Sequence, residues 1–142
     1  MPRIFLDSSA FFAAAYSRTG HAYDLLLMGV RGEIGIVISQ IVITEVRRNL
    51  AESAPDRLEV LDYIMGGISF ELVKPTKRQV VAAIKYVVLK DAPIVAAARM
   101  AKVDYLVTLD KKHLLGKPEL VRYVRADILT PQQAFERLSQ AN

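Results

Sequence analysis

Residues 90–110 read KDAPIVAAARMAKVDYLVTLD, and this stretch decides the fold. The alanine-rich run over 92–102 predicts a helix that opens next to an acid, Asp91. The apolar run over 104–107 predicts a short buried strand. A strand that follows a helix after only a few residues is typical of proteins in which helices connect the parallel strands of one sheet.

The same alternation extends in both directions from this stretch. Short apolar runs without polar alternation indicate strands that are covered on both faces. We therefore expect an α/β protein with a mostly parallel sheet and helices on both faces, in one domain over residues 1–142. Further strands are expected at 3–6, 34–38, 68–73 and 122–128, and further helices at 10–17, 21–30, 40–52, 56–65, 77–89 and 131–139.

The composition excludes several classes of protein. The chain contains no cysteine, which rules out disulfides and cysteine-ligated metal sites, and its two histidines are far apart in sequence. No apolar run reaches the ~18 residues of a membrane span. The N-terminal residues lack the pattern of a signal peptide, so we expect a cytoplasmic protein without a membrane segment.

The charge favours an anionic partner. The formal net charge is +4 and the isoelectric point is about 9.4. When the four acids discussed next are set aside, 19 basic residues face 11 acidic ones. A local acidic pocket within a basic surface suits a metal site that acts on a polyanion. Many soluble proteins are mildly basic, however, so charge alone leaves the question open.

Four acids are expected at one edge of the sheet. Asp7 follows the first strand, and Asp110 lies three residues beyond Val107, at the end of a later strand. Connecting helices begin at the same edge, which places Asp91 there. Glu45 lies about a turn and a half into its helix, roughly 7–9 Å from the helix start. Four acids that are distant in sequence thus face one crevice.

Clustered carboxylates repel one another unless a cation is present. Hard oxygen ligands without cysteine or histidine select Mg²⁺ or Mn²⁺. We expect Asp7, Glu45 and Asp91 as ligands, Asp110 as a further ligand or holder of a water molecule, and the Thr108 and Ser9 hydroxyls as support. Each acid also has a simpler explanation: a helix cap for Asp7 and Asp91, a turn for Asp110, and solvation or pairing with Arg48 or Asn49 for Glu45.

Four spans resemble the PIN domain in order, spacing and flanking residues. They are IFLDSS (4–9), ITEV (43–46), KDAPIVAAA (90–98) and DYLVTLD (104–110), followed by ILTP at 128–131. The resemblance implies a three-layer α/β/α sandwich and a Mg²⁺- or Mn²⁺-dependent endoribonuclease. Its acids map onto Asp7, Glu45, Asp91 and Asp110. In small prokaryotic members, it implies a VapC-type toxin that dimerises and is silenced by a small antitoxin protein.

Basic residues beside the acids are candidate contacts for the RNA backbone, namely Arg47, Lys111 and Lys112. His113 is expected to be a loop residue rather than a general base, and Phe11, Phe12 and Tyr16 are expected in the core rather than in a base-stacking platform. Two other functions are considered. A catalytically silent PIN-like module would bind RNA or a partner without cleavage. A phospho-acceptor domain would need a second acid beside Asp7, which the sequence lacks.

Overall fold

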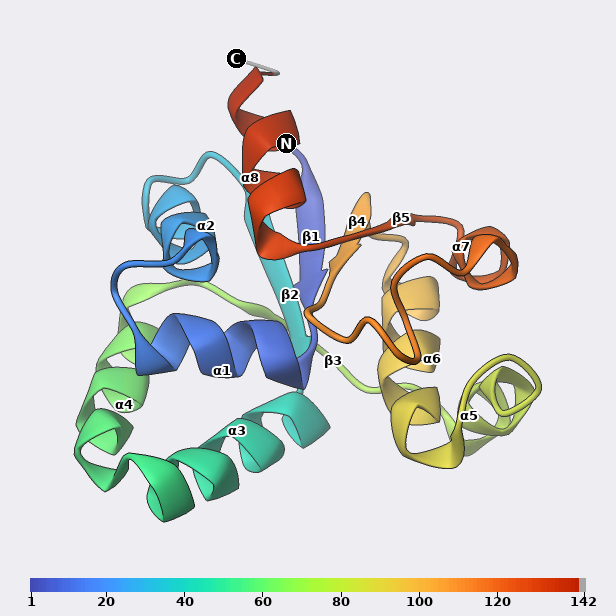
Figure 1. The fold of residues 1–142 in the computed structure, drawn as a ribbon, viewed down its shortest axis with the longest axis horizontal. Coiled ribbons are helices and arrows are strands. Elements are labelled where there is room, and N and C mark those ends of the chain that lie inside the picture. The colour runs from blue at the N-terminus through green and yellow to red at the C-terminus, as the bar shows by residue number, and fades with distance from the viewer. Residues whose placement is uncertain (141–142) are drawn as a thin grey trace.

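The computed structural model describes residues 1–140 and contains a five-stranded sheet at its centre (Figure 1). The order of the strands across the sheet is β3-β2-β1-β4-β5, and every neighbouring pair is parallel. The predicted parallel α/β class is therefore confirmed. The strands are β1 (Arg3–Leu6), β2 (Gly35–Ser39), β3 (Glu71–Val73), β4 (Tyr105–Val107) and β5 (Asp127–Leu129).

The helices form two groups on either side of the sheet (Figure 1). One group comprises α1 (Ser8–Tyr16), α2 (His21–Val30), α3 (Gln40–Ser53), α4 (Leu58–Gly67) and α8 (Pro131–Gln140). The other comprises α5 (Lys77–Ala83), α6 (Ala92–Ala101) and α7 (Pro118–Val124). Short 3₁₀ turns, η1 (Pro55–Arg57) and η2 (Leu89–Asp91), precede α4 and α6. The three layers match the predicted sandwich.

The core is continuous through the sheet because the central strands have no exposed apolar side chain. Phe5 in β1 and Leu106 in β4 are completely buried. The alanines of α6, at positions 96–98, are buried as well, and their small side chains let this helix lie close to its neighbours. This packing fixes the start of α6, and hence Asp91, relative to β1 and β4.

Three expected elements differ from the structure. The strand predicted over 68–73 forms only over Glu71–Val73, because α4 continues to Gly67. The helix predicted over 77–89 ends at Ala83, where tighter hydrogen bonds, such as the one from the Tyr86 N–H to the Ala83 carbonyl, replace the α-helical pattern. The β-branched residues that follow, with exposed side chains, favour helix weakly. The strand predicted over 122–128 was wrong at its start, because residues 118–124 form a helix that buries Leu120 and Val124 one turn apart.

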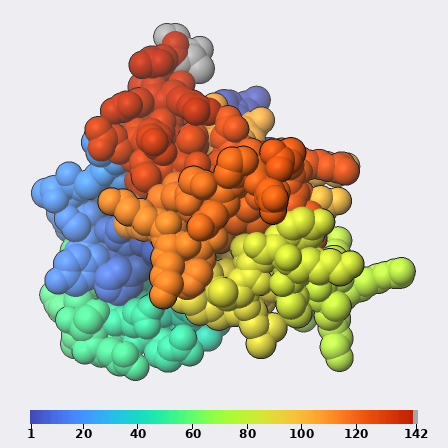
Figure 2. Space-filling view, turned by 45° about the vertical axis from the view of Figure 1, so that its right-hand side comes forward, coloured from blue at the N-terminus to red at the C-terminus, as the bar shows by residue number. Residues whose placement is uncertain are grey.

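The strand order places the centre of the molecule at a topological switch point. The chain moves from β1 outward to β2 and β3, and later crosses to β4 and β5 on the other side of β1. Helices therefore diverge from the carboxyl ends of β1 and β4, which leaves a crevice there. Figure 2 shows the residues after β4 (orange) between the N-terminal helices (blue) and the α5–α6 region (yellow). Within residues 1–140, no helix combines the length and the apolar character needed to cross a bilayer.

Candidate active site

Asp7 begins the site at the carboxyl end of β1. Its backbone N–H donates to the Val107 carbonyl of β4 at 3.1 Å, so the sheet itself fixes its position. One carboxylate oxygen accepts the Ala10 N–H at 2.9 Å and caps α1. The predicted cap is thus real, but it uses only one of the two oxygens. The residue is 6% exposed, which is unusual for a carboxylate that no cationic side chain contacts.

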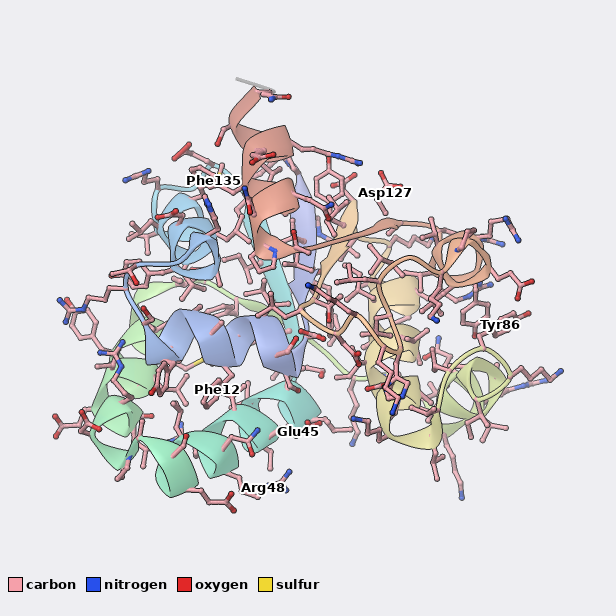
Figure 3. The ribbon with its side chains drawn as sticks, in the orientation of Figure 1. Phe12, Glu45, Arg48, Tyr86, Asp127 and Phe135 are labelled. Carbon is pink, nitrogen blue, oxygen red and sulfur yellow. The ribbon has the colours of Figure 1, made fainter. Side chains whose placement is uncertain are left out.

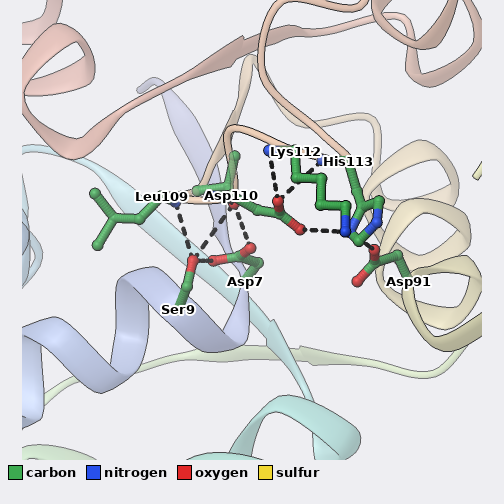
Figure 4. Close-up of polar contacts among 8 residues, drawn as sticks. Asp7, Ser9, Asp91, Leu109, Asp110, Lys112 and His113 are labelled. Carbon is green, nitrogen blue, oxygen red and sulfur yellow. Dashed lines mark hydrogen bonds and ion pairs between the residues drawn. The ribbon is translucent and has the colours of Figure 1, made fainter. Parts of the chain in front are cut away.

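Two hydroxyl groups orient the Asp7 carboxylate, as predicted from the sequence. The buried Thr108 hydroxyl donates to Asp7 Oδ2, and the Ser9 hydroxyl donates to Oδ1 at 2.7 Å. Both hydroxyls also accept backbone N–H groups of the turn after β4, from Asp110 and Leu109, each at 3.0 Å. These contacts tie the ends of β1 and β4 together around one carboxylate (Figure 4).

Asp110 closes the turn that follows β4. Its Oδ1 accepts the backbone N–H groups of Lys112 and His113 at 3.0 and 2.9 Å. Its Oδ2 lies 3.4 Å from Nδ1 of His113, and the same nitrogen lies 3.5 Å from Oδ2 of Asp91 (Figure 4). His113 therefore bridges two of the four acids. The sequence interpretation treated it as a loop residue; its spacing of three residues after Asp110 was the available signal.

Asp91 precedes α6 but makes no capping hydrogen bond with its side chain. Its Oδ2 is buried and accepts no hydrogen bond within residues 1–140, and its contact with His113 Nδ1 at 3.5 Å is an ion-pair distance only. The Ser8 hydroxyl, which lines the same cavity, is also buried without a partner. Ligand atoms of Asp91, Asp110 and His113 all lie within 4.8 Å of one another. Buried oxygens without donors and a compact group of ligand atoms both fit a hard cation bound at this position.

The carboxylates differ in how their surroundings affect their charge. Burial raises the pKa of Asp7 even though the Thr108, Ala10 and Ser9 hydrogen bonds act to lower it. Burial also raises the pKa of Asp91, and the negative charge of Asp110 adds to this effect. For Asp110, burial is outweighed by hydrogen bonds and by His113, so its pKa is lowered. Two of the acids are thus held in places that disfavour their own charge, as functional carboxylates commonly are.

Glu45 shares a cavity with the three aspartates but stands apart from their contacts. It lies on α3, which Ser39 caps at its start, and its side chain is half-buried. The cavity measures about 810 Å³. Its lining includes all four predicted acids and Ser9, together with Ser8, Phe12, Gln40, Ile41, Thr44, Arg48, Asn49, Lys90 and Ile94. The predicted convergence of the acids on one crevice agrees with this arrangement.

The basic residues predicted to bind RNA lie less centrally. Arg47 forms an ion pair with Asp62 at 2.8 Å and does not line the cavity, whereas its neighbour Arg48 does. Lys111 and Lys112 belong to the turn after Asp110, and Lys112 lines a second groove beside His113. The RNA-binding role of Lys111 and Lys112 stays a prediction, whereas the ion pair of Arg47 and its place outside the cavity favour Arg48 over Arg47 as the contact on α3. Phe11 is buried as expected, but Tyr16 is exposed and Phe12 lines the cavity.

Comparisons with known proteins agree with this architecture. A family model for the PIN domain matches residues 4–115. A crystal structure of the protein PAE2754 from Pyrobaculum aerophilum is similar, with a TM-score of 0.65 and 19% identity, over 98% of this chain and 96% of that one. No curated protein matches the chain in sequence.

Two further solved structures share the fold. VapBC2 from Rickettsia felis, bound to a DNA fragment from its promoter, has a TM-score of 0.64 and 16% identity, over 90% of this chain and 98% of that one. FitAcB from Neisseria gonorrhoeae has a TM-score of 0.59 and 15% identity, over 91% and 98%. PIN domains are generally nucleases that use a divalent metal ion. Because the family match runs from the first strand to the turn after Asp110, and so contains all four acids, this chain belongs to the PIN domain family.

Proposed function

We propose that this protein is a Mg²⁺- or Mn²⁺-dependent ribonuclease that hydrolyses phosphodiester bonds within RNA. The observation that supports the proposal most is the buried Oδ2 of Asp91, which accepts no hydrogen bond among the described residues and has His113 Nδ1 at 3.5 Å as its ion-pair contact. Ligand atoms of Asp91, Asp110 and His113 lie within 4.8 Å of one another, and Asp91 and Asp110 line a cavity shared with Asp7 and Glu45. Burying these carboxylates together is unfavourable in the apo protein. A bound cation would remove this cost, and the basic surroundings would attract a polyanionic substrate.

Each of these residues would have its own role in the site. Asp7, Asp91 and Glu45 would hold the ion, and Asp110 would complete the set or hold a water molecule. The divalent ion would lower the pKa of a water molecule and neutralise charge on the phosphodiester. Thr108 and Ser9 keep the Asp7 carboxylate in one orientation through their hydrogen bonds. Such support commonly decides how well a metal ligand performs.

Loss of the carboxylate charge tests the proposal directly. Asp7→Asn and Asp91→Asn should each reduce Mn²⁺-dependent cleavage of single-stranded RNA at least a hundredfold, because both remove a negatively charged ligand while keeping the shape of the side chain. Asp56→Asn is the matched control, since this acid is exposed and lies outside the cavity. Equal cleavage by the wild type and both site variants, or no cleavage by the wild type, would refute a ribonuclease site here.

We further propose that the protein is the toxin of a VapBC-type toxin–antitoxin pair. The support is the PIN family match, with a fold shared with VapBC2 and FitAcB. Expression in a bacterial host should arrest growth, and co-expression of an antitoxin, which we expect to be a small protein encoded by a neighbouring gene, should relieve the arrest. Arrest that persists in the Asp7→Asn variant, or an unaffected host, would contradict the toxin role and leave the nuclease assay as a separate question.

A homodimer is the third part of the proposal. The segment from α5 to η2 exposes a series of aliphatic side chains: Val81 (56%), Ile84 (42%), Val88 (42%) and Leu89 (70%). An exposed apolar patch of this kind is typical of a protein interface. Light scattering should give the mass of a dimer for the wild type and of a monomer for Leu89→Glu. A wild-type monomer at micromolar concentration would contradict this assignment.

A further inference from the structure

The cavity is larger than a metal site requires, and its two sides differ in chemistry. Three of the acids, Asp7, Asp91 and Asp110, lie at the ends of β1 and β4 and at the start of α6. The other side is formed by α1 and α3 and, besides Glu45, carries apolar and amide groups: Phe12, Gln40, Ile41 and Asn49, with Arg48. A volume of about 810 Å³ is in the range of cavities that hold whole small molecules. The α1–α3 side therefore has room for more than a phosphate and an ion.

Phe12 gives this side an aromatic surface. Its ring stacks against Tyr16 with centroids 5.5 Å apart and ring planes inclined by 24°, which holds it in place on α1. Phe12 is only half-buried and lines the cavity (Figure 3). Ile41, across the cavity on α3, is 43% exposed although it is aliphatic. A flat apolar ligand held between these side chains would cover both.

Polar groups beside Phe12 complete a pattern suited to a nucleotide. Arg48 and Asn49 follow Glu45 by three and four residues, so they share its face of α3. Among the described residues, neither side chain has a hydrogen-bond or ion-pair partner, in contrast to Arg47, which is paired with Asp62. An unpaired guanidinium can bind a phosphate, and a free amide can both donate to and accept from the edge of a base.

We propose that the α1–α3 side of the cavity is a nucleobase subsite for the nucleotide next to the cleaved phosphate. The base stacks on Phe12, Asn49 bonds its edge, and Arg48 binds the adjoining phosphate. Stacking on an aromatic side chain requires an unpaired base, so the substrate is single-stranded at this position. This assignment rests on the proposed ribonuclease function and adds a source of sequence preference to it.

The stacking contact is tested by removing the Phe12 ring from the protein and the base from the RNA, separately and together. The probe is a fluorescent eight-nucleotide RNA, with one abasic nucleotide moved through it, bound to the cleavage-deficient Asp7→Asn protein in Mg²⁺. At one position, loss of the base should weaken binding about fivefold to a hundredfold when Phe12 is present. In the Phe12→Leu protein, removal of the same base should weaken binding less than twofold. The Phe12→Tyr protein should respond to its removal as the protein with Phe12 does. If removal of the base weakened binding equally with and without the Phe12 ring, the proposed subsite would be wrong.

The two neighbouring arginines provide a matched control for the phosphate contact. Arg48→Ala and Arg47→Ala remove the same charge from the same turn of α3, so any general effect of net charge is equal. Arg48→Ala should weaken binding about fivefold and reduce the slope of log affinity against log salt by about 0.7, the value for one phosphate of a single strand. Arg47→Ala should change binding less than twofold. Equal effects of the two variants would overturn the role of Arg48.

Sequence preference gives the last readout and separates the two proposals. Cleavage of a random single-stranded RNA pool by the wild type should show a base preference beside the cut, and Asn49→Ala should weaken that preference at least threefold while cleavage continues. Cleavage without preference in both proteins would overturn the subsite and leave the ribonuclease intact. Absence of cleavage by the wild type would instead refute the ribonuclease, and the binding cycle would still decide whether a base occupies this side.

Discussion

The two edges of the sheet treat their acidic residues in opposite ways. At the amino edge, Asp104 accepts the backbone N–H of Arg3 at 2.8 Å, and the Arg3 guanidinium pairs with Glu71. At the carboxyl edge, among residues 1–140, Asp7 and Asp91 have no basic side chain in direct contact except His113 beside Asp91. An acid at the amino edge is thus paired with an arginine, and Asp7 and Asp91 at the carboxyl edge are not, which is an imbalance in side-chain pairing. The imbalance marks the edge that is built to bind something.

At the amino edge, the Arg3 side chain supplies the positive charge, so no bound cation is needed there. Besides Glu71, its guanidinium donates to the carbonyl of Ala101 at 2.7 Å, at the end of α6. One cation therefore satisfies an acid and a helix terminus, which is a structural use of charge. In the part of the chain that the structure describes, no lysine or arginine does the same at the opposite edge, where hydroxyls, backbone groups and His113 contact the carboxylates. Four predictions test this contrast.

The largest expected effect comes from the two acids that flank β4. Asp110→Asn, at the carboxyl edge, should reduce Mn²⁺-dependent RNA cleavage about a hundredfold or more, because it removes a charge from the proposed metal site. Asp104→Asn, at the amino edge, should leave cleavage within twofold and lower stability by about 1 kcal/mol through a weaker hydrogen bond to Arg3. Steady-state cleavage and thermal melts measure both. A comparable loss of cleavage in Asp104→Asn would remove the distinction between the edges.

Metal addition should stabilise the protein only through the carboxyl edge. At a Mn²⁺ concentration a hundred times the dissociation constant, the free energy of unfolding should rise by about 2.7 kcal/mol, which raises the melting temperature by roughly 5–10 °C. Asp7→Asn should lose most of this shift, and Asp104→Asn should keep it. Differential scanning fluorimetry with and without Mn²⁺ provides the measurement. An equal shift in Asp7→Asn would place the ion elsewhere.

Without metal, Asp7→Asn should make the protein more stable. Its pKa is raised above the ordinary value of 3.8 in the folded state, so the folded chain binds more protons than the unfolded chain between these two values. The contribution of Asp7 to stability is therefore greatest below pH 3.8 and is lost as the pH rises through the folded pKa. In EDTA at pH 7, the variant should gain about 1 kcal/mol, as substitutions at strained functional sites often do.

Urea unfolding across a pH series checks this prediction. The gain of Asp7→Asn over the wild type should shrink as the pH falls and disappear near pH 3.8. Asparagine keeps the bonds from Ala10 and Ser9, and the Thr108 hydroxyl can accept from the new amide, so the comparison isolates the charge. A variant that is less stable than the wild type at pH 7 would show that the Asp7 charge is well satisfied without metal.

The smallest effect should come from the exposed pair at the amino edge. Glu71→Gln removes one partner of Arg3, but both side chains are substantially exposed, at 32% and 51%. Such pairs contribute about 0–1 kcal/mol, and less at high salt. Cleavage should be unchanged, and the melting temperature should fall by at most a few degrees, less in 0.5 M NaCl. A clear loss of RNA cleavage would connect this edge to function.

The sequence predicted most of the fold because its strands and helices carry strong local signals. Helix α3 was expected at 40–52 and occupies Gln40–Ser53, with Ser39 at its cap. The weaker predictions involved segments whose local signals conflict. Tyr123 and Val124 are residue types that favour a strand, yet Pro118 starts a helix there, and the burial of Leu120 with Val124 decides the outcome. Local preference gives way when packing favours another structure.

The sequence by itself determined the parallel sheet and the convergence of its acids, because topology places every strand end and helix start at the same edge. Only the tertiary structure decided which side chains meet there. His113 reaches Asp91 and Asp110 through the turn after β4, and Arg48 lines the cavity while Arg47 faces Asp62. Such choices depend on the rotation of a helix and the shape of a turn, and small differences in packing set both.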